Sequence, residues 1–205
     1  MSPLKFIEPC RPMLQAEPPL GPLWSHEVKF DGYRVQVHKD RDSVTVFSRR
    51  GADFTRRAGR AIVEAVRRLD CESCILDGEL VAFGDNGLPS FEALHGRTSK
   101  SLAIVVFDVL AIEGVDLRAK PLSERREMLR GLMTEQGALV LSEAFDDPHA
   151  LLAACAERGL EGIVSKRSDK PYRSGSSHDW VKVKTAVWKA ANRERGKLFA
   201  ADNDG

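Results

Sequence analysis

Lys29 is the residue of this chain whose surroundings most clearly suggest covalent chemistry. It opens a six-residue segment, positions 29–34, with the pattern K-x-D-G-x-R. The Asp–Gly pair is a turn signal, so the chain should fold back beneath Lys29 and leave its amine at the rim of a pocket. A protonated amine is a poor nucleophile, but neighbouring cations favour the deprotonated form, which can attack a phosphorus or a carbonyl carbon. A surface lysine beside a hairpin turn is the competing interpretation.

Five further segments place charged or aromatic side chains where apolar strands are expected. A lone carboxylate is unfavourable in such surroundings, so Glu79 and Glu161 each predict a ligand or a cation as partner. Lys182 and Lys184 share one face of a strand, because side chains alternate with period two. For Phe107, a place in the core is the competing interpretation. The segments cover residues 47–51, 76–80, 106–110, 160–166 and 180–184.

These side chains need elements that bring distant parts of the chain together. Alternating residues from 35 to 48 predict a β-hairpin directly after the lysine segment, and an amphipathic helix is predicted from Phe54 to Leu69. The other expected elements are an extended lead-in over residues 1–23, buried strand on either side of 77–79, a turn at 85–87, a short helix at 90–94, a strand at 102–110, helices around 122–133 and 147–159, and strands at 162–166 and 180–184. This order is typical of an α+β fold with mostly antiparallel strands. Because Lys29 does not follow a glycine-rich loop, neither a P-loop nor a dinucleotide-binding fold fits.

Charge is unevenly distributed along the chain, although the formal net charge is only +1. Residues 29–68 hold eleven Lys/Arg against five Asp/Glu, and residues 160–197 hold ten against four. If the fold brings both stretches together, they form one basic face suited to a polyanion such as nucleic acid or nucleotide phosphates. Two separate solvated surfaces are the alternative.

The composition describes a protein that can build its own core. The 205 residues are 42% hydrophobic and 30% charged, enough for one large domain or two small ones. No apolar run is long enough to span a membrane and the first residues lack a signal-peptide pattern, which predicts an intracellular protein. Four cysteines are too few for a disulfide framework. Cys71 and Cys74 form a lone C-x-x-C, better interpreted as two ordinary thiols than as a zinc or redox site.

Taken in order, these segments resemble the motifs of the covalent nucleotidyltransferases, which include ATP-dependent DNA ligases, RNA ligases and mRNA capping enzymes. The resemblance is closest to the ligase modules of bacterial DNA end-joining proteins and runs from about Phe6 to Lys184. It implies a nucleotidyltransferase (ATP-grasp-like ligase) fold, with a nucleotide cleft between mostly antiparallel sheets flanked by helices. It also implies an adenylation domain over residues 1–190 and a polar, disordered tail over 191–205. The residues that carry it most clearly are 12–14, 27–34, 161–167 and 180–184.

The resemblance further implies a reaction in three steps. Lys29 would attack the α-phosphate of ATP to form lysyl-AMP, AMP would pass to a DNA 5′-phosphate, and the 3′-hydroxyl would displace it to seal the nick. Lys182 and Lys184 would neutralise the phosphate and help Lys29 lose its proton, because stabilising the phosphoryl charge is most of the catalytic task. Other implied contacts are Mg²⁺ at Glu161 and Asp31, the adenine edge at Glu27, adenine stacking by Phe107, the ribose hydroxyl at Glu79, and the ribose, phosphate or nicked strand at Arg34 and Arg49.

The resemblance breaks after the paired lysines, where related ligases continue into an OB-fold domain. Only 21 residues follow Lys184, so the sequence predicts an adenylation domain without that barrel. The expected partners are nicked or broken double-stranded DNA and a protein that supplies the OB-fold or DNA-end-binding function; the expected location is the bacterial cytoplasm, at the nucleoid. Two alternatives stay open: an RNA ligase or capping-type nucleotidyltransferase, and a non-catalytic module that binds nucleotides or DNA ends.

Overall fold

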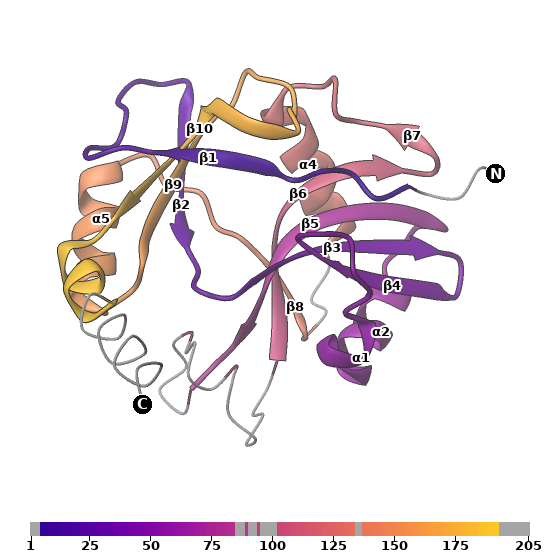
Figure 1. Cartoon of the computed structure of the whole chain (residues 1–205). Helices are drawn as coiled ribbons and strands as arrows, with labels where there is room; N and C mark the ends of the chain where they lie inside the picture. Colours follow the sequence, from indigo (N-terminus) through magenta and orange to yellow (C-terminus); the bar gives the residue numbers. More distant parts are fainter. Residues whose placement is uncertain (1–4, 85–88, 90–93, 95–101, 134–136, 193–205) are drawn as a thin grey trace.

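Six strands form the larger of two β-sheets. The computed structural model describes residues 5–84, 89, 94, 102–133 and 137–192. The strands of this sheet are β3 (Tyr33–Asp40), β4 (Ser43–Ser48), β5 (Ser73–Ala82), β6 (Leu102–Ile112), β7 (Val115–Asp116) and β8 (Leu139–Leu141). They lie in the order β4-β3-β5-β6-β7, and β8 pairs in parallel with β6 (Figure 1). The predicted hairpin is confirmed, since β3 and β4 pair antiparallel with Val37 opposite Val46, both fully buried.

The smaller sheet joins the two ends of the described chain. Its strands are β1 (Cys10–Leu14), β2 (Trp24–Lys29), β9 (Gly162–Arg167) and β10 (Gly175–Lys184), in the order β1-β10-β9-β2. The first pair is parallel and the others are antiparallel. The predicted lead-in is therefore partly a strand, and the last strand begins at Gly175, earlier than its alternation indicated. Lys29 thus ends an edge strand of this sheet, and the following turn carries the chain into β3.

Helices cover the outer faces of both sheets (Figure 1). The predicted helix from Phe54 to Leu69 is wrong in one respect, because it is divided into α1 (Thr55–Ala58) and α2 (Arg60–Arg67). Gly59 separates them with φ 89°, a conformation that glycine adopts without steric penalty. The other two predicted helices are confirmed as α4 (Leu122–Leu132) and α5 (Pro148–Glu157). At the start of α5, the Asp147 carboxylate accepts hydrogen bonds from two backbone N–H groups, as an N-cap residue does.

Three hydrophobic clusters hold these layers together. The largest lies on the helix-covered side of the six-stranded sheet and includes Ile62, Leu76 and Leu129. The smallest joins α5 to the four-stranded sheet. The third joins the inner faces of the two sheets through residues such as Phe107 and Trp180. The sheets are therefore fixed against each other at one end of the space between them.

Some sequence predictions lie outside the described residues: the turn at 85–87, most of the helix at 90–94, and the tail from 193 onward. Residues 186–192 form a helical segment after β10, so positions 191 and 192 are helical and not part of an irregular tail. None of the helices in the described ranges is both long and apolar enough to cross a bilayer.

Candidate active site

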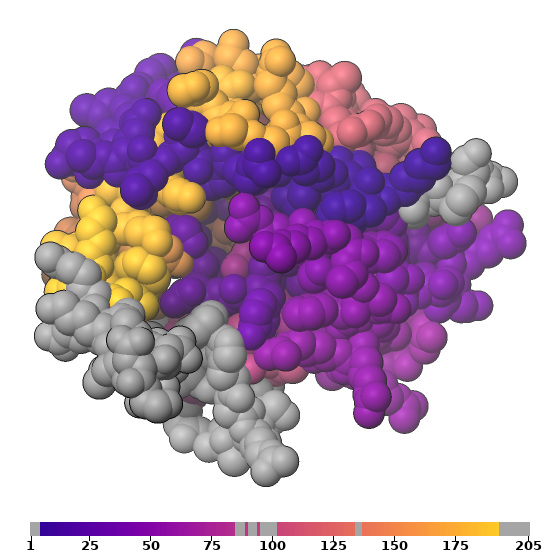
Figure 2. Space-filling model, in the orientation of Figure 1, coloured from indigo at the N-terminus to yellow at the C-terminus, as the bar shows by residue number. Residues whose placement is uncertain are grey.

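A cavity of about 610 Å³ opens between the two sheets, and it collects every residue that the sequence marked as functional. The surface is hollowed between the yellow C-terminal segment and the purple and magenta segments of the six-stranded sheet (Figure 2). Strands from both sheets and the turns after β2 and β4 form its walls. The predicted residues that line it are Glu27, Lys29, Asp31, Arg34, Arg49, Glu79, Phe107, Glu161, Lys182 and Lys184.

Strand alternation explains why one wall of the cavity carries so much charge. Strands β2, β9 and β10 lie side by side, and residues directly opposite each other point to the same face. This register produces successive rows across the three strands, and every member of the rows except Ser25 and Gly162 lines the cavity. The rows are Ser25–Lys166–Trp180, Glu27–Val164–Lys182 and Lys29–Gly162–Lys184.

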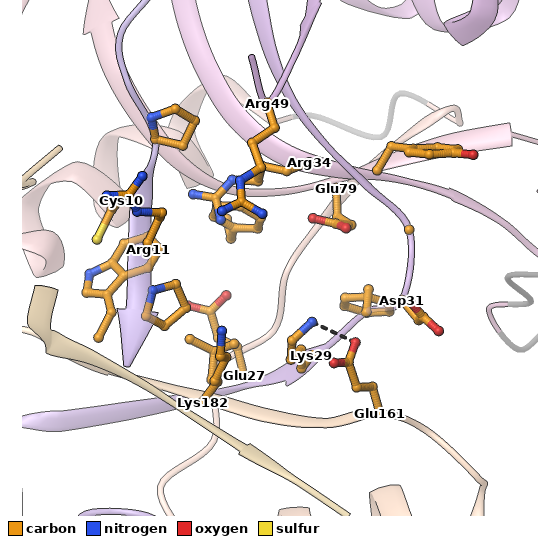
Figure 3. A pocket seen from close by; sticks show the side chains of 18 of the residues that line it. Cys10, Arg11, Glu27, Lys29, Asp31, Arg34, Arg49, Glu79, Glu161 and Lys182 are labelled. Atoms are coloured by element: carbon orange, nitrogen blue, oxygen red, sulfur yellow. Dashed lines mark hydrogen bonds and ion pairs between the residues drawn. The ribbon is translucent and has the colours of Figure 1, made fainter. Parts of the chain in front are cut away.

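The Lys29 amine is held at the centre of this wall by Glu161. Its Nζ lies 2.6 Å from Oε2 of Glu161 (Figure 3). The Nζ of Lys184 lies 2.9 Å from the other oxygen of the same carboxylate. Glu161 is nearly buried, whereas both lysines keep about a quarter of their side-chain surface exposed. One carboxylate thus brings two ammonium groups together. The sequence predicted a ligand or a cation as the partner of Glu161, and the structure provides two cations.

A third lysine adds unbalanced positive charge at the same place. Among the described residues, no carboxylate forms an ion pair with Lys182. Its pKa is lowered by burial and by the nearby charges of Lys29 and Lys184. An ammonium group that its surroundings disfavour in this way is suited to bind an anion, because the anion relieves the repulsion.

Gly162 sits between Lys29 and Lys184, where a side chain would collide with β10. Its φ is +151°, and a Cβ atom would overlap the carbonyl oxygen of Val183. We expect Gly162→Ala to lower the free energy of unfolding by about 3 kcal/mol, because overpacking adds to backbone strain. Gly159→Ala is the matched control, since φ is +66° there but a Cβ would meet nothing within 4 Å, and it should cost only about 1 kcal/mol. Equal losses in urea denaturation would contradict the steric explanation.

Asp31 lies across from Glu161 at the turn that follows β2. Burial and the negative charge of Glu161 raise its pKa, while a hydrogen bond from the Trp188 indole acts against this. The next residue, Gly32, passes so close to β5 that a Cβ would overlap the carbonyl oxygen of Leu80. The predicted sharp turn is confirmed, and it places a second carboxylate beside the Lys29–Glu161 pair (Figure 3).

The opposite wall of the cavity is built around Arg34. Its guanidinium forms a bidentate ion pair with the fully buried Asp77, with Nε–Oδ1 and Nη2–Oδ2 distances of 2.6 and 2.7 Å. The Tyr172 hydroxyl donates to the same carboxylate at 2.7 Å. Arg34 is thereby fixed against the wall, and its Cζ lies 4.4 Å from the ring centre of Phe107. The sequence had singled out Arg34 but neither Asp77 nor Tyr172 as its supports.

Glu79 lies beside Arg34, directly opposite it in the β3–β5 pair. Burial raises the pKa of Glu79 to about 7, although the charges of Arg34 and Lys29 act in the other direction. The carboxyl group therefore changes its charge near neutral pH. Arg34 and Lys29 are the cations whose charges act on it, but among the described residues Glu79 forms no ion pair, so the expectation of a cation or ligand partner stays a prediction.

The raised pKa of Glu79 predicts a pH dependence of stability. Between pH 4.5, the ordinary value, and about pH 7, the folded state binds more protons than the unfolded state, so the free energy of unfolding falls as the pH rises. Glutamine does not ionise, so Glu79→Gln removes this loss of stability. Between pH 4.5 and pH 8, the free energy of unfolding of the variant should rise relative to that of the wild type by about 1–3 kcal/mol. This is less than the full pKa shift would give, because the site keeps some solvent contact. Urea denaturation of both proteins across this range tests it; parallel curves would contradict it.

Glu27 is the centre of a buried network that sequence reasoning missed. Its carboxylate lies 2.9 Å from Nη1 of Arg126 and 2.8 Å from Nζ of Lys166, and it accepts a 2.6 Å hydrogen bond from the Ser142 hydroxyl. The Lys166 ammonium lies 4.3 Å from the Phe107 ring centre. Phe107 is 8% exposed, so its ring belongs to the core and to the cavity wall at once. The signal for Lys166 was its alternation with Gly162 and Val164; Arg126 and Ser142 gave no signal.

The two basic stretches of the sequence meet in this cavity. Its lining holds eight Lys/Arg side chains, among them the exposed Arg49, against four Asp/Glu. The excess of positive charge favours one basic face over two separate solvated surfaces. Such a cavity attracts a polyanionic ligand.

Comparison with known proteins agrees with this fold. A family model described as ATP dependent DNA ligase domain matches residues 17–184. The multifunctional non-homologous end joining protein LigD of Pseudomonas aeruginosa is 37% identical over 188 residues, a match that covers 88% of this chain and 22% of that protein. The ligase domain from Mycobacterium tuberculosis LigD superposes with a TM-score of 0.73 at 29% identity, covering 87% of this chain and 59% of that chain. A mycobacterial DNA ligase D complexed with ATP and MES gives 0.68 at 30% identity, covering 84% and 60%.

The chain belongs to the ATP-dependent DNA ligase domain family. The predicted α+β nucleotidyltransferase fold is confirmed by its similarity to the mycobacterial ligase domain. The chain spans about a fifth of the Pseudomonas relative and about three fifths of the two solved structures.

Proposed function

We propose that this chain catalyses ATP-dependent DNA ligation through a lysyl-AMP formed at Lys29. The Lys29 nitrogen attacks the α-phosphorus of ATP, the P–N bond forms as the bond to pyrophosphate breaks, and the amine loses its proton. An oxygen of the DNA 5′-phosphate then takes the AMP, which frees the lysine. Finally the 3′-hydroxyl attacks the activated 5′-phosphate and AMP leaves.

One observation carries this proposal: Lys29 and Lys184 share the carboxylate of Glu161 in a cavity of nucleotide size. Lys182 lies beside them and forms no ion pair within the described part of the chain. The cations neutralise charge that develops on the phosphoryl group and on the departing pyrophosphate. On the facing wall we assign the ribose hydroxyl to Glu79 and the adenine stack to Phe107. We also assign the edge of the adenine to the main chain near Glu27. Arg34 and Arg49 are assigned to the ribose, the phosphate or the nicked strand.

Mg²⁺ fits the acidic side of the cavity. The repulsion that Glu161 exerts on Asp31 is the kind of arrangement that a divalent cation relieves. Among the described residues, no three His, Cys, Asp or Glu side chains form a metal-binding group of their own. This donor set suits Mg²⁺, which commonly takes one or two carboxylates and completes its shell with phosphate oxygens and water. When bound, the ion would add positive charge at the phosphate oxygens.

We infer a DNA substrate from the family, and we infer that partners determine which DNA ends are sealed. We assign residues 1–190 to the adenylation domain, and we infer that sealing of broken ends depends on a protein or segment that supplies what the mycobacterial ligase domain has beyond the matched region. Few phosphate contacts from this domain alone mean weak DNA binding that weakens further with salt. Addition of such a partner should therefore raise sealing more than it raises adenylation.

Intact mass after incubation with ATP and Mg²⁺ tests the central step. We expect a gain of one AMP, and discharge of that AMP when a nicked duplex with a 5′-phosphate is added. A nucleotide adduct formed with GTP but not with ATP would indicate a capping-type transferase. Sealing of RNA nicks but not of DNA nicks would indicate an RNA ligase. Absence of any adduct would indicate a module that binds nucleotides or DNA ends without turnover.

A further inference from the structure

A second group of reactive side chains lies outside the active-site cavity. Cys71 follows α2 in the turn before β5, and Cys74 is the second residue of β5. Neither thiol lines the cavity. All four cysteines are reduced in the structure, but only these two lie next to each other.

A buried lysine sits beside both thiols. Lys39 pairs directly with Cys74 across the β3–β5 ladder, so their side chains share one face. Lys39 is only 4% exposed. Its Nζ donates hydrogen bonds to the carbonyl oxygens of Arg67 and Leu69, at 2.7 and 2.6 Å. The backbone N–H of Cys71 donates to the same Leu69 oxygen at 2.8 Å. One carbonyl therefore holds the ammonium next to the Cys71 backbone.

This contact removes an obstacle to a negatively charged sulfur. Arg67 is the last residue of α2, and the C-terminal end of a helix carries partial negative charge that disfavours a thiolate. Lys39 satisfies carbonyls at that end and places a full positive charge there. A buried lysine is rarely left without a partner charge, and among the described residues Lys39 donates only to carbonyl oxygens. The neighbouring thiols can supply the counter-charge.

The two thiols have different environments, and the difference assigns them different roles. Cys74 is fully buried, whereas Cys71 is partly exposed to solvent. The neighbouring Cys74 thiol lowers the pKa of Cys71, helped by Lys39, although burial and the charges of Glu113 and Asp70 oppose this. The Cys71 thiol and burial raise the pKa of Cys74. Of the two thiols, the accessible Cys71 therefore gives up its proton more readily than the buried Cys74.

We propose that Cys71 and Cys74 are a redox-active dithiol, which a small disulfide such as oxidised glutathione converts to an intramolecular disulfide. The Cys71 thiolate attacks one sulfur of the small disulfide and expels the other as a thiolate. Cys74 then gives up its proton and attacks the Cys71 sulfur, which expels the second thiolate. Two electrons pass to the small disulfide, which becomes two thiols.

The other two cysteines serve as internal controls. Cys10 and Cys155 are 2% and 1% exposed. Burial raises the pKa of Cys10 to about 11 and also raises the pKa of Cys155. Neither has a thiol neighbour among the described residues. Selective oxidation of the pair would leave both reduced.

The test treats the folded full chain with oxidised glutathione, unfolds it, alkylates the remaining thiols and measures the tryptic peptides by mass. Cys71 and Cys74 share one peptide, because no Lys or Arg separates them. We expect that peptide to lack alkyl groups and to weigh two hydrogens less than the dithiol, while Cys10 and Cys155 are alkylated. In Cys74→Ala we expect a stable glutathione adduct at Cys71. In Lys39→Met, checked for folding by circular dichroism, alkylation of Cys71 should slow by about tenfold, as for one pKa unit.

Three outcomes would overturn the proposal. A fully alkylated peptide in the wild type would show that the thiols do not react. A lasting glutathione adduct on wild-type Cys71 would show that Cys74 cannot reach it. Oxidation of Cys10 and Cys155 at the same rate would show that the pair is not special. Lys29→Ala should oxidise like the wild type, so a failed adenylation reaction and a failed oxidation are separable.

Discussion

Lys29→Arg is expected to form no detectable covalent AMP, a loss of at least about 10⁴-fold, because a guanidinium keeps its proton and offers no nucleophilic nitrogen. Arginine preserves the positive charge that faces Glu161, so the cavity should keep its ion pairs. Intact mass after incubation with ATP and Mg²⁺ measures the adduct directly. The same variant should lose sealing of an ordinary nick in proportion.

A nick whose 5′-phosphate already carries AMP provides the control for this variant. The last step uses the 3′-hydroxyl of the DNA and no lysine nucleophile, so Lys29→Arg should still seal such a nick at a measurable rate. This result would show that the variant folds and binds DNA. An AMP adduct that persists in Lys29→Arg would place the nucleophile elsewhere and remove the basis of the proposed function.

The predictable part of the site depends on local patterns. Glu27 and Lys29 alternate along one strand and Lys182 and Lys184 along another, and a strand with period two must place each pair on one face. The sequence also identified the turn at Asp31, since Asp–Gly needs little context to bend the chain. Candidate site residues could therefore be assigned to one face of each strand without knowledge of the pairing between the strands.

The unpredictable part depends on contacts across long sequence distances. Arg126 reaches Glu27 from a helix 99 residues away in sequence, and Tyr172 reaches Asp77 across 95 residues. Nothing in the local pattern of α4 distinguishes a buried arginine from a solvated one. The division of the helix at Gly59 was also hidden, because the apolar stripe continues through the break and a glycine inside a helix is tolerated. Burial of charge is a property of the assembled sheets, and only the structure shows it.

The C-x-x-C segment also depends on a contact from a distant part of the sequence, which its local pattern does not indicate. Its spacing alone favoured two ordinary thiols, because no second C-x-x-C and no His at ligand spacing accompanies it. The feature that changes this interpretation is Lys39, which lies in a different strand and reads in the sequence as one more alternating polar residue. A cation placed by sheet register thus gives a chemical role to a motif that is uninformative by itself.

Lys182→Met is expected to slow adenylation of Lys29 by about 10²–10³-fold, because it removes one preorganised charge from the site where phosphoryl charge develops. Lys182 is free of carboxylate partners among the described residues, so its loss disrupts no ion pair, and its aliphatic stem is retained in methionine. Burial and the charges of Lys29 and Lys184 lower the pKa of Lys182, so loss of this ammonium group should not destabilise the free protein. Single-turnover rates of AMP adduct formation, with urea denaturation beside them, measure both effects.

Lys189→Met is the matched control for this prediction. Lys189 lies seven positions further along, in the exposed helical segment after β10, and does not line the cavity. The two variants lose the same net charge, so a general electrostatic effect on ATP binding would slow both equally. We expect adenylation by Lys189→Met to stay within about twofold of the wild type, because a solvated charge outside the site is screened. A similar loss in both variants would assign the effect to the overall field of the protein, and Lys182 would then have no specific role at the α-phosphate.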